Sequence, residues 1–122
     1  MATIFHLAFP EDWAAAVEAG CYRWSTRGKS LDDGATFIHA SRYDQVAMVA
    51  NFVYDDVAGP LDLLVIDTER LVSALCDEDL DGIGISFPHV YGPLNLDAVV
   101  DVRRYQRAAD GRWPEVAAEA VS

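Results

Sequence analysis

Apolar and polar positions in the N-terminal part of the chain predict a strand, a helix, an irregular loop and a second strand. Residues 3–8 (Thr-Ile-Phe-His-Leu-Ala) form a short apolar run that is typical of a strand. Pro10 and the two acids after it suit a first helical turn, and the alanine-rich segment that follows continues this helix until Gly20. Turn-forming residues dominate 21–33, which predicts a functional loop or a short edge hairpin, and a second strand is predicted over 35–40.

The middle of the chain predicts one clear helix and a buried strand. Apolar residues at 46, 49, 50 and 53 follow the i, i+3, i+4, i+7 spacing of a helix of about three turns, and Ser41 with Asp44 resembles a capping box before it. Residues 61–67 are almost continuously apolar, as in a central strand. Thr68 is a suitable N-cap for a short helix that ends at Leu75, and the acidic segment 77–82 predicts a loop.

The stretch 87–100 combines two prolines with a histidine, a tyrosine and an apolar run. Pro88 and Pro93 fix the backbone angle φ at about −65°, so they hold His89 and Tyr91 on a stiff segment. We expect a rigid loop here that leads into a last strand over 98–105. The alanine- and glutamate-rich tail, 113–122, is predicted to be a short helix or a frayed end.

These elements predict a single compact α+β domain over residues 1–122, with a small, split, mostly antiparallel sheet flanked by two N-terminal helices. Hydrophobic residues make up 52% of the chain, but no uncharged apolar run approaches the ~18 residues of a membrane span. The N-terminus has no basic segment followed by an apolar one, so we expect no secretory signal and a cytoplasmic location. Cys21 and Cys76 have no close-spaced partner and are expected to be buried free thiols.

The net charge of −11 argues against a general nucleic-acid surface or an anionic membrane as the partner, because phosphate binding needs clustered Lys and Arg. Between residues 43 and 102, Arg70 is the only basic residue against twelve acids, whereas a basic cluster lies in the first third. If the protein binds an anionic small molecule, we expect that cluster to hold it. The alternative is an ordinary solvated loop. The candidate binding residues are Arg23, Arg27, Lys29 and Ser41.

The chain contains three histidines, His6, His39 and His89, and each lies beside or near an aromatic residue at the start of a turn. His6 and His39 both lie near the end of a predicted strand ahead of a predicted helix. If these strands are neighbours in a sheet, their imidazoles can point into one cleft, with His89 and Tyr91 completing it. Imidazole titrates near neutral pH, so His39 or His89 could act as an acid or a base. A purely structural role is the alternative at each position.

The spacing gives less support to other chemistry. Three imidazoles could bind Zn²⁺ with an open position for water, as in a metal hydrolase, but no His-x-His or His-x-x-x-His pair exists, so we expect no metal. Cys21, near the basic residues, could be a nucleophile. The acidic segment before Gly82 lacks the distal glutamate of a calcium-binding loop.

Two stretches resemble a known family. Residues 37–41 (Phe-Ile-His-Ala-Ser), with Gln45-Val46-Ala47 and Ala50-Asn51 after them, and above all residues 87–94 (Phe-Pro-His-Val-Tyr-Gly-Pro-Leu) resemble the bacterial domain of unknown function 952 family. The resemblance covers nearly the whole chain up to about Tyr105, and it departs at 35–36, where a glycine is expected before the phenylalanine. The family's name implies no assigned activity.

A fainter similarity is to the ADP-ribosyltransferase-like fold of NAD-using enzymes and RNA 2′-phosphotransferases. It implies that His6 lies in the first motif, which binds a ribose, that residues 37–50 form the second, and that His89 and Tyr91 form the third. The transferases place Glu or Gln in the third motif. This chain has neither there, which removes an electrostatic contribution of a few kcal/mol.

Three functional hypotheses follow. The first, implied by this similarity, is an enzyme that acts on NAD, ADP-ribose or a related nucleotide-like molecule by ribosyl or phosphoryl group transfer or by hydrolysis. Its catalytic cleft would contain His6, His39, His89 and Tyr91. The second is a non-catalytic small-molecule-binding or interaction module. The third is the tri-histidine metal hydrolase.

Overall fold

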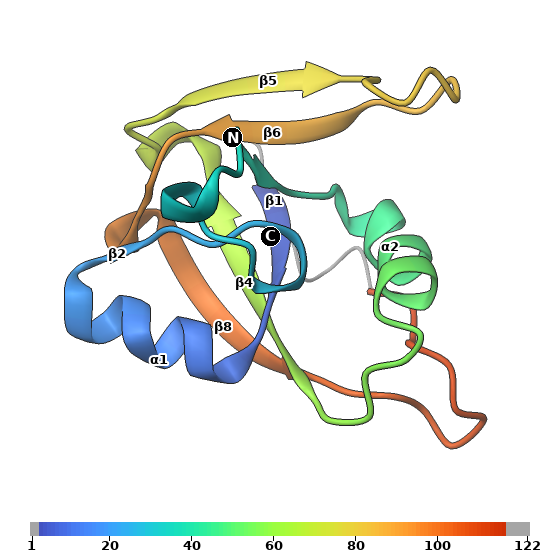
Figure 1. Ribbon diagram of the computed structural model, residues 1–122. Helices are drawn as coiled ribbons and strands as arrows, with labels where there is room; N and C mark the ends of the chain where they lie inside the picture. The colour runs from blue at the N-terminus through green and yellow to red at the C-terminus, as the bar shows by residue number, and fades with distance from the viewer. Residues whose placement is uncertain (1–2, 117–122) are drawn as a thin grey trace.

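Residues 3–116, which the computed structural model describes, fold into three small antiparallel sheets and two α-helices (Figure 1). The strands are β1 (Thr3–Ala8), β2 (Cys21–Tyr22), β3 (Ile38–His39), β4 (Leu61–Asp67), β5 (Ala74–Glu78), β6 (Phe87–Tyr91), β7 (Leu94–Asn95) and β8 (Val99–Tyr105). The α-helices are α1 (Pro10–Ala19) and α2 (Val46–Val53). The architecture is therefore α+β with a split, antiparallel sheet, as the sequence predicts.

The first sheet has the strand order β1-β4-β8 and is covered on both faces. Alternate residues of β4 join different apolar clusters: Leu64 and Ile66 pack in the cluster that contains α1, whereas Leu63 and Val65 pack in the cluster that contains α2. Because both faces are buried, most positions of β1 and β4 are apolar. The predicted strands at 3–8 and 61–67 are confirmed, and β4 is central as predicted.

Helix α1 begins and ends where the sequence predicts. Pro10 starts it with two acids in the first turn, and Gly20 ends it at a φ of 91°, a left-handed backbone angle that a side chain disfavours. Helix α2 is shorter than predicted, because a separate 3-10 turn precedes it at 43–45. Its cap differs as well, since the Gln45 side chain accepts the backbone N–H of Arg42 at 3.0 Å.

The second sheet, with the order β3-β6-β5, corrects two predictions. Phe87–Tyr91 is its central strand rather than a loop, and the helix predicted from Thr68 ends after one 3-10 turn, so that Ala74–Glu78 becomes the edge strand β5. Pro88 lacks a backbone N–H on the side that faces β3. The loss is tolerated because Pro88 lies just beyond the end of the short strand β3, where its carbonyl still accepts the backbone N–H of Ala40 at 2.9 Å. Pairing between distant segments outweighs the local signals.

The segment after β8 returns to α2. Trp113 is buried, its ring stacks on Tyr105 with centroids 5.3 Å apart, and its backbone N–H donates to the side chain of Asn51 at 2.9 Å. Residues 113–116 are not helical, and Trp113 and Val116 pack in the cluster that contains α2, which corrects the prediction of a short helix or a frayed end for that part. The rest of that prediction, 117–122, lies outside the described residues.

The short strands β2 and β7 pair with each other and tie the segment after α1 to the segment before β8. Cys21, in β2, is half-buried and Cys76, in β5, is exposed, so the prediction that both thiols are buried is wrong. None of the helices within 3–116 combines the length and the apolar character needed to cross a membrane.

Candidate functional site

One face of the β3-β6-β5 sheet carries most of the candidate residues. Ile38 and Val90 pack in the core, so their neighbours along the strands project to the opposite face. This outer face presents Phe37, His39, Phe87, His89 and Tyr91. Their rings are close together: His89 stacks on Phe37 with centroids 4.0 Å apart, and the centroids of His39 and His89 lie 5.4 Å apart. The sheet therefore brings two of the three histidines together.

His39 also lines an open groove between α2 and the loop that joins β5 to β6. These two elements lie on the same side of the molecule (Figure 1). The groove has a volume of about 420 Å³. Phe52 is 84% exposed and Ile83 is 60% exposed, and large apolar side chains gathered at a surface mark a binding site. The lining residues are Thr26, His39, Met48, Val49, Phe52, Val53, Asp81, Ile83 and Phe87.

The imidazole of His39 is uncharged at neutral pH. Burial lowers its pKa from 6.5 to about 4, and the neighbouring imidazole of His89 contributes to this shift. Among the described residues, neither ring nitrogen of His39 has a hydrogen-bond partner, while its backbone N–H donates to Ser25 at 3.1 Å. The ring therefore keeps one donor and one acceptor that no described residue uses.

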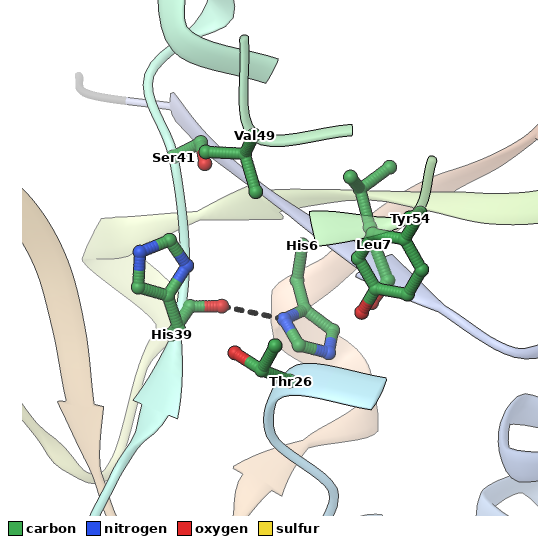
Figure 2. Close-up of a pocket in the computed structure, with 7 residues that line it drawn as sticks. All are labelled: His6, Leu7, Thr26, His39, Ser41, Val49 and Tyr54. Carbon is green, nitrogen blue, oxygen red and sulfur yellow. Dashed lines mark hydrogen bonds between the residues drawn. The ribbon is translucent and has the colours of Figure 1, made fainter. Parts of the chain in front are cut away.

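His6 lies beside His39, and both of its ring nitrogens form hydrogen bonds within the protein (Figure 2). Its Nδ1 lies 2.6 Å from the backbone carbonyl of His39, which can only accept, so Nδ1 carries the proton. Its Nε2 therefore accepts from the Tyr22 hydroxyl at 2.8 Å. Burial lowers the pKa of His6 to about 4, and the ring stays neutral. With both nitrogens occupied, His6 braces β3 and has none left for a substrate.

A cavity of about 10 Å³, the size of one water molecule, lies between His6 and the helix α2 (Figure 2). Thr26, His39 and Val49 line both this cavity and the groove, so the two spaces adjoin. Ser41 lines the cavity and is buried, and its backbone exchanges two hydrogen bonds of 2.7 Å with Phe5. The structure thus brings Ser41 to the two histidines, although not as the helix cap that the sequence predicts.

Glu78, which the sequence did not single out, holds both His89 and Tyr91. Its Oε1 accepts from Nδ1 of His89 at 3.0 Å and from the Tyr91 hydroxyl at 2.6 Å. The bonds from Tyr91 and then His89 lower the pKa of Glu78, and the carboxylate raises the pKa of Tyr91 to about 12. Residues 76 and 78 project to the same face of a strand, so the sequence would have indicated this contact only if 74–78 had been predicted to be a strand.

The basic residues predicted to bind phosphate do not converge on the histidines. Arg23 forms a bidentate pair with Asp32, and Arg27 forms one with Asp56. Each guanidinium lowers the pKa of its carboxylate, chiefly through these hydrogen bonds. Lys29 is exposed. Both arginine charges are therefore already neutralised by a neighbour.

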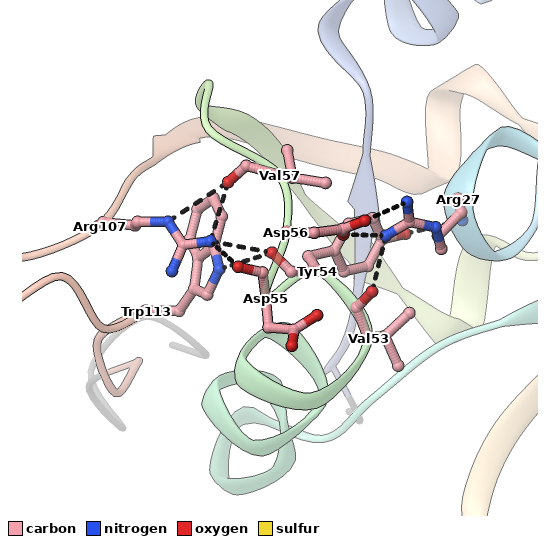
Figure 3. Close-up of polar contacts among 8 residues, drawn as sticks. All are labelled: Arg27, Val53, Tyr54, Asp55, Asp56, Val57, Arg107 and Trp113. Carbon is pink, nitrogen blue, oxygen red and sulfur yellow. Dashed lines mark hydrogen bonds and ion pairs between the residues drawn. The ribbon is translucent and has the colours of Figure 1, made fainter.

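Two arginines clamp the turn that follows α2 (Figure 3). On one side, Nη1 of Arg27 donates at 2.8 Å to the carbonyl of Val53, a residue that lines the groove. On the other side, Nη2 of Arg107 donates to three backbone carbonyls in 54–57 at 2.7 to 3.1 Å, and its guanidinium lies 4.8 Å from the ring centroid of Trp113. The clamp holds the end of α2 and with it one wall of the groove.

The described residues contain no group of three or more His, Cys, Asp or Glu side chains that could hold a metal ion. His6 uses both ring nitrogens within the protein, and His89 uses Nδ1 for Glu78. The tri-histidine hydrolase hypothesis therefore gains no support. Cys21 belongs to the β2-β7 sheet, whereas His39 and His89 belong to the β3-β6-β5 sheet.

Comparisons with known proteins agree on one family. A sequence model of the family described as "Protein of unknown function (DUF952)" matches residues 8–102. No curated protein matches the chain. The chain is similar to the crystal structure of CC0527 from Caulobacter crescentus, with 29% identity, a TM-score of 0.77 and coverage of 93% of this chain and 94% of that chain.

The solution NMR structure of the same Caulobacter crescentus protein is 30% identical, with a TM-score of 0.73 and coverage of 92% of this chain and 91% of that chain. The fainter similarity to the ADP-ribosyltransferase-like fold gains no support from these matches. Because the family model matches well over half of the sequence, the chain belongs to the DUF952 family of proteins of unknown function.

Proposed function

We propose that this protein binds a small molecule in the groove between α2 and the β5–β6 loop, with His39 as its polar contact. The observation that carries the proposal is an uncharged imidazole, without a hydrogen-bond partner among the described residues, in an otherwise largely apolar groove. Apolar walls with a few placed polar groups are the usual composition of a ligand site. The apolar part of the ligand lies against Met48, Phe52 and Phe87, and a hydroxyl or N–H group donates to His39.

The charge of the groove favours an uncharged or cationic ligand. Asp81 is the only charged side chain among the residues that line it, and the whole chain carries a net charge of −11. An anionic group placed there would be repelled by Asp81 and would find no cation in the lining. This argument favours the small-molecule-binding module over an enzyme for nucleotides.

Thermal unfolding with a panel of uncharged and cationic aromatic compounds tests the proposal. A compound that binds only the folded state stabilises it by roughly 2.7 kcal/mol at a concentration of 100 times its Kd, and the melting temperature rises accordingly. His39→Phe keeps a ring in place but removes the acceptor, so we expect it to weaken binding by about tenfold. Val72→Ala, at an exposed residue outside the groove lining, is the control and should bind normally.

Two results would contradict the proposal. One is the absence of any stabilising compound in the panel. The other is a compound that binds His39→Phe as tightly as the parent protein, because the polar contact would then lie elsewhere.

A second candidate is a nucleotide-like ligand such as NAD or ADP-ribose, with His39 or His89 as the acid or base in group transfer or hydrolysis. The observation in its favour is Arg27, whose guanidinium contacts the carbonyl of Val53 at the edge of the groove. Asp56 already pairs with that guanidinium, so a phosphate would have to displace a carboxylate.

Titration with ADP-ribose, NAD and the uncharged nucleoside adenosine separates the two candidates. If the nucleotides stabilise the protein more than adenosine does, and if Arg27→Gln removes the difference, the second candidate is supported. If adenosine stabilises as much as the nucleotides, no phosphate contact exists and the second candidate fails. Release of nicotinamide or phosphate during the titration would show catalysis.

We also propose a cytoplasmic location. Both cysteines of the chain are free, and the cytosol keeps thiols reduced. Cell fractionation tests this, since recovery of the protein in a secreted or membrane fraction would contradict it.

A further inference from the structure

Three polar side chains line the groove between α2 and the β5–β6 loop: Thr26, His39 and Asp81. They come from three separate segments, because Thr26 belongs to a 3-10 turn at Thr26–Gly28, His39 belongs to β3, and Asp81 lies between β5 and β6. Among the described residues, none of the three side chains has a hydrogen-bond partner. Three unused polar groups that line one space can together fix the orientation of a ligand.

Two observations place Thr26 and Asp81 near the imidazole of His39. Thr26 lines the small cavity beside His6 together with His39, and Figure 2 shows the two side chains there. Burial and the ring of His89 lower the pKa of His39, whereas the carboxylate of Asp81 acts in the opposite direction. The carboxylate is therefore close enough to act electrostatically on the ring, and it forms no ion pair with any described residue.

The three groups share the ability to accept hydrogen bonds. The carboxylate of Asp81 only accepts, the neutral imidazole of His39 has one accepting nitrogen, and the hydroxyl oxygen of Thr26 accepts as well. A primary ammonium group has three N–H donors and a positive charge, so it can satisfy all three acceptors and neutralise the carboxylate. An alcohol has one donor and no charge, and a phosphate would be repelled by Asp81.

The rest of the groove suits an apolar body attached to the ammonium group. Met48 and Phe52 come from α2, and Ile83 comes from the β5–β6 loop, so apolar side chains line both walls. The volume of about 420 Å³ lies within the range of roughly 300–1,000 Å³ that is usual for small-molecule sites. The groove therefore offers room and apolar contact for an aromatic or aliphatic group.

We propose that the groove binds a small primary amine in its protonated form, with the ammonium group held by Asp81, His39 and Thr26. The apolar body of the amine lies against Phe52 and Ile83. This inference rests on the proposed function and narrows its ligand to one chemical class. Asp81 supplies the opposite charge, and the two neutral groups select N–H donors over a methylated cation.

Three probes with the same phenyl group and linker test this class. Phenethylamine is a protonated primary amine at neutral pH, its N,N,N-trimethyl derivative keeps the charge without N–H donors, and phenethyl alcohol has neither the charge nor the three donors. Titration followed by two-dimensional NMR gives each Kd, and the shifted amide signals locate the probe. We expect phenethylamine to bind about five-fold more tightly than the alcohol, and several-fold more tightly than the trimethyl derivative.

Two carboxylate variants separate Asp81 from the general negative charge of the chain. Asp81→Asn should abolish the advantage of phenethylamine over phenethyl alcohol. Asp44→Asn removes the same charge at an exposed position outside the groove lining, so it should keep that advantage. Thr26→Val keeps the shape of the side chain but removes its oxygen, and we expect it to weaken phenethylamine several-fold with little effect on the trimethyl derivative.

The outcomes distinguish this inference from the proposed function. Equal Kd values for phenethylamine and phenethyl alcohol, both raised by His39→Phe, would overturn the inference and leave the proposed function standing. An advantage of phenethylamine that survives in Asp81→Asn would also overturn it, because the attraction would then come from the chain as a whole. Failure of phenethylamine to shift amide signals around the groove would overturn it as well, while the panel of aromatic compounds decides the proposed function separately.

Discussion

The three histidines differ in how many ring nitrogens remain available. His6 gives both of its nitrogens to the protein, and His89 gives Nδ1 to Glu78. His39 keeps both free of hydrogen bonds among the described residues. The imidazole is thus fixed by two hydrogen bonds at His6, by one at His89 and by none at His39, because its neighbours differ at each position.

The hydrogen bond between Tyr22 and His6 can be tested for its contribution to stability. Tyr22→Phe removes the hydroxyl that donates to Nε2 of His6 and leaves that nitrogen buried without a donor. A buried polar group without a partner costs roughly 1–3 kcal/mol, so we expect the free energy of unfolding, measured with urea, to fall by that amount. Tyr43→Phe, at an exposed tyrosine, is the control and should change it by less than about 0.5 kcal/mol. Equal effects of the two changes would show that His6 does not depend on Tyr22.

Among the elements, α2 and the β5–β6 pair form the two walls of the groove, so the contacts that hold them decide its shape. Arg107 holds the turn at the end of α2. Arg107→Ala removes its bonds to three carbonyls in 54–57 and its contact with Trp113. Hydrogen bonds from a charged group contribute roughly 1.5–3 kcal/mol, so we expect the free energy of unfolding to fall by about 2 kcal/mol. Arg104→Ala, at an exposed position of β8, should change it by less than about 0.5 kcal/mol. If both variants unfold at the same urea concentration, the contacts of Arg107 contribute nothing to the free energy of unfolding.

The turn between β6 and β7 requires glycine at position 92. Gly92 has a φ of 145°, and a Cβ there would lie 2.6 Å from Oγ of Ser73. Gly92→Ala should therefore destabilise the fold by roughly 1–3 kcal/mol, which a thermal melt would show as a lower melting temperature. A Cβ at Gly59 would meet no atom within 4 Å, and the φ of Gly59 is not left-handed, so Gly59→Ala should be neutral or slightly stabilising. An unchanged melting temperature for Gly92→Ala would contradict this account of the turn.

For the molecule as a whole, two histidines make stability depend on pH. The pKa values of His6 and His39 are about 4 in the folded state, against 6.5 for a free side chain, so the unfolded chain binds more protons between these values. The stability that this difference contributes is fully present above about pH 6.5 and is lost as the pH falls toward 4. We expect the free energy of unfolding to be lower at about pH 4.5 than at about pH 7.

His39→Asn isolates one of the two contributions. The variant lacks one lowered pKa, so its free energy of unfolding should fall less between these two pH values than that of the parent protein. An equal fall in the parent and the variant would mean that the pKa of His39 is not lowered in the folded state.

The elements that the sequence predicts well are those whose pattern is local. Pro10 and Gly20 mark the two ends of α1, and burial on both faces makes the run at 63–66 apolar throughout. The helix predicted from Thr68 is wrong, because its N-cap signal is also met by a single 3-10 turn and the following residues gain more from pairing with β6. The strand at 87–91 was missed because two prolines are typical of a loop, and only the end of the short strand β3 leaves room for Pro88.

The chain's local pattern predicted the α+β class, the family, the two helices and the strands at 3–8 and 61–67, because these depend on periodicity and on residues close together in the chain. It also indicated His39, His89 and Tyr91, without showing which nitrogens stay available. The available nitrogens follow from the folded arrangement, which also places Glu78 and Cys76 beside His89 and forms the groove around His39. Hydrogen-bond partners, burial and groove walls come from strands and helices far apart in the sequence, and pairing between such segments leaves no local pattern.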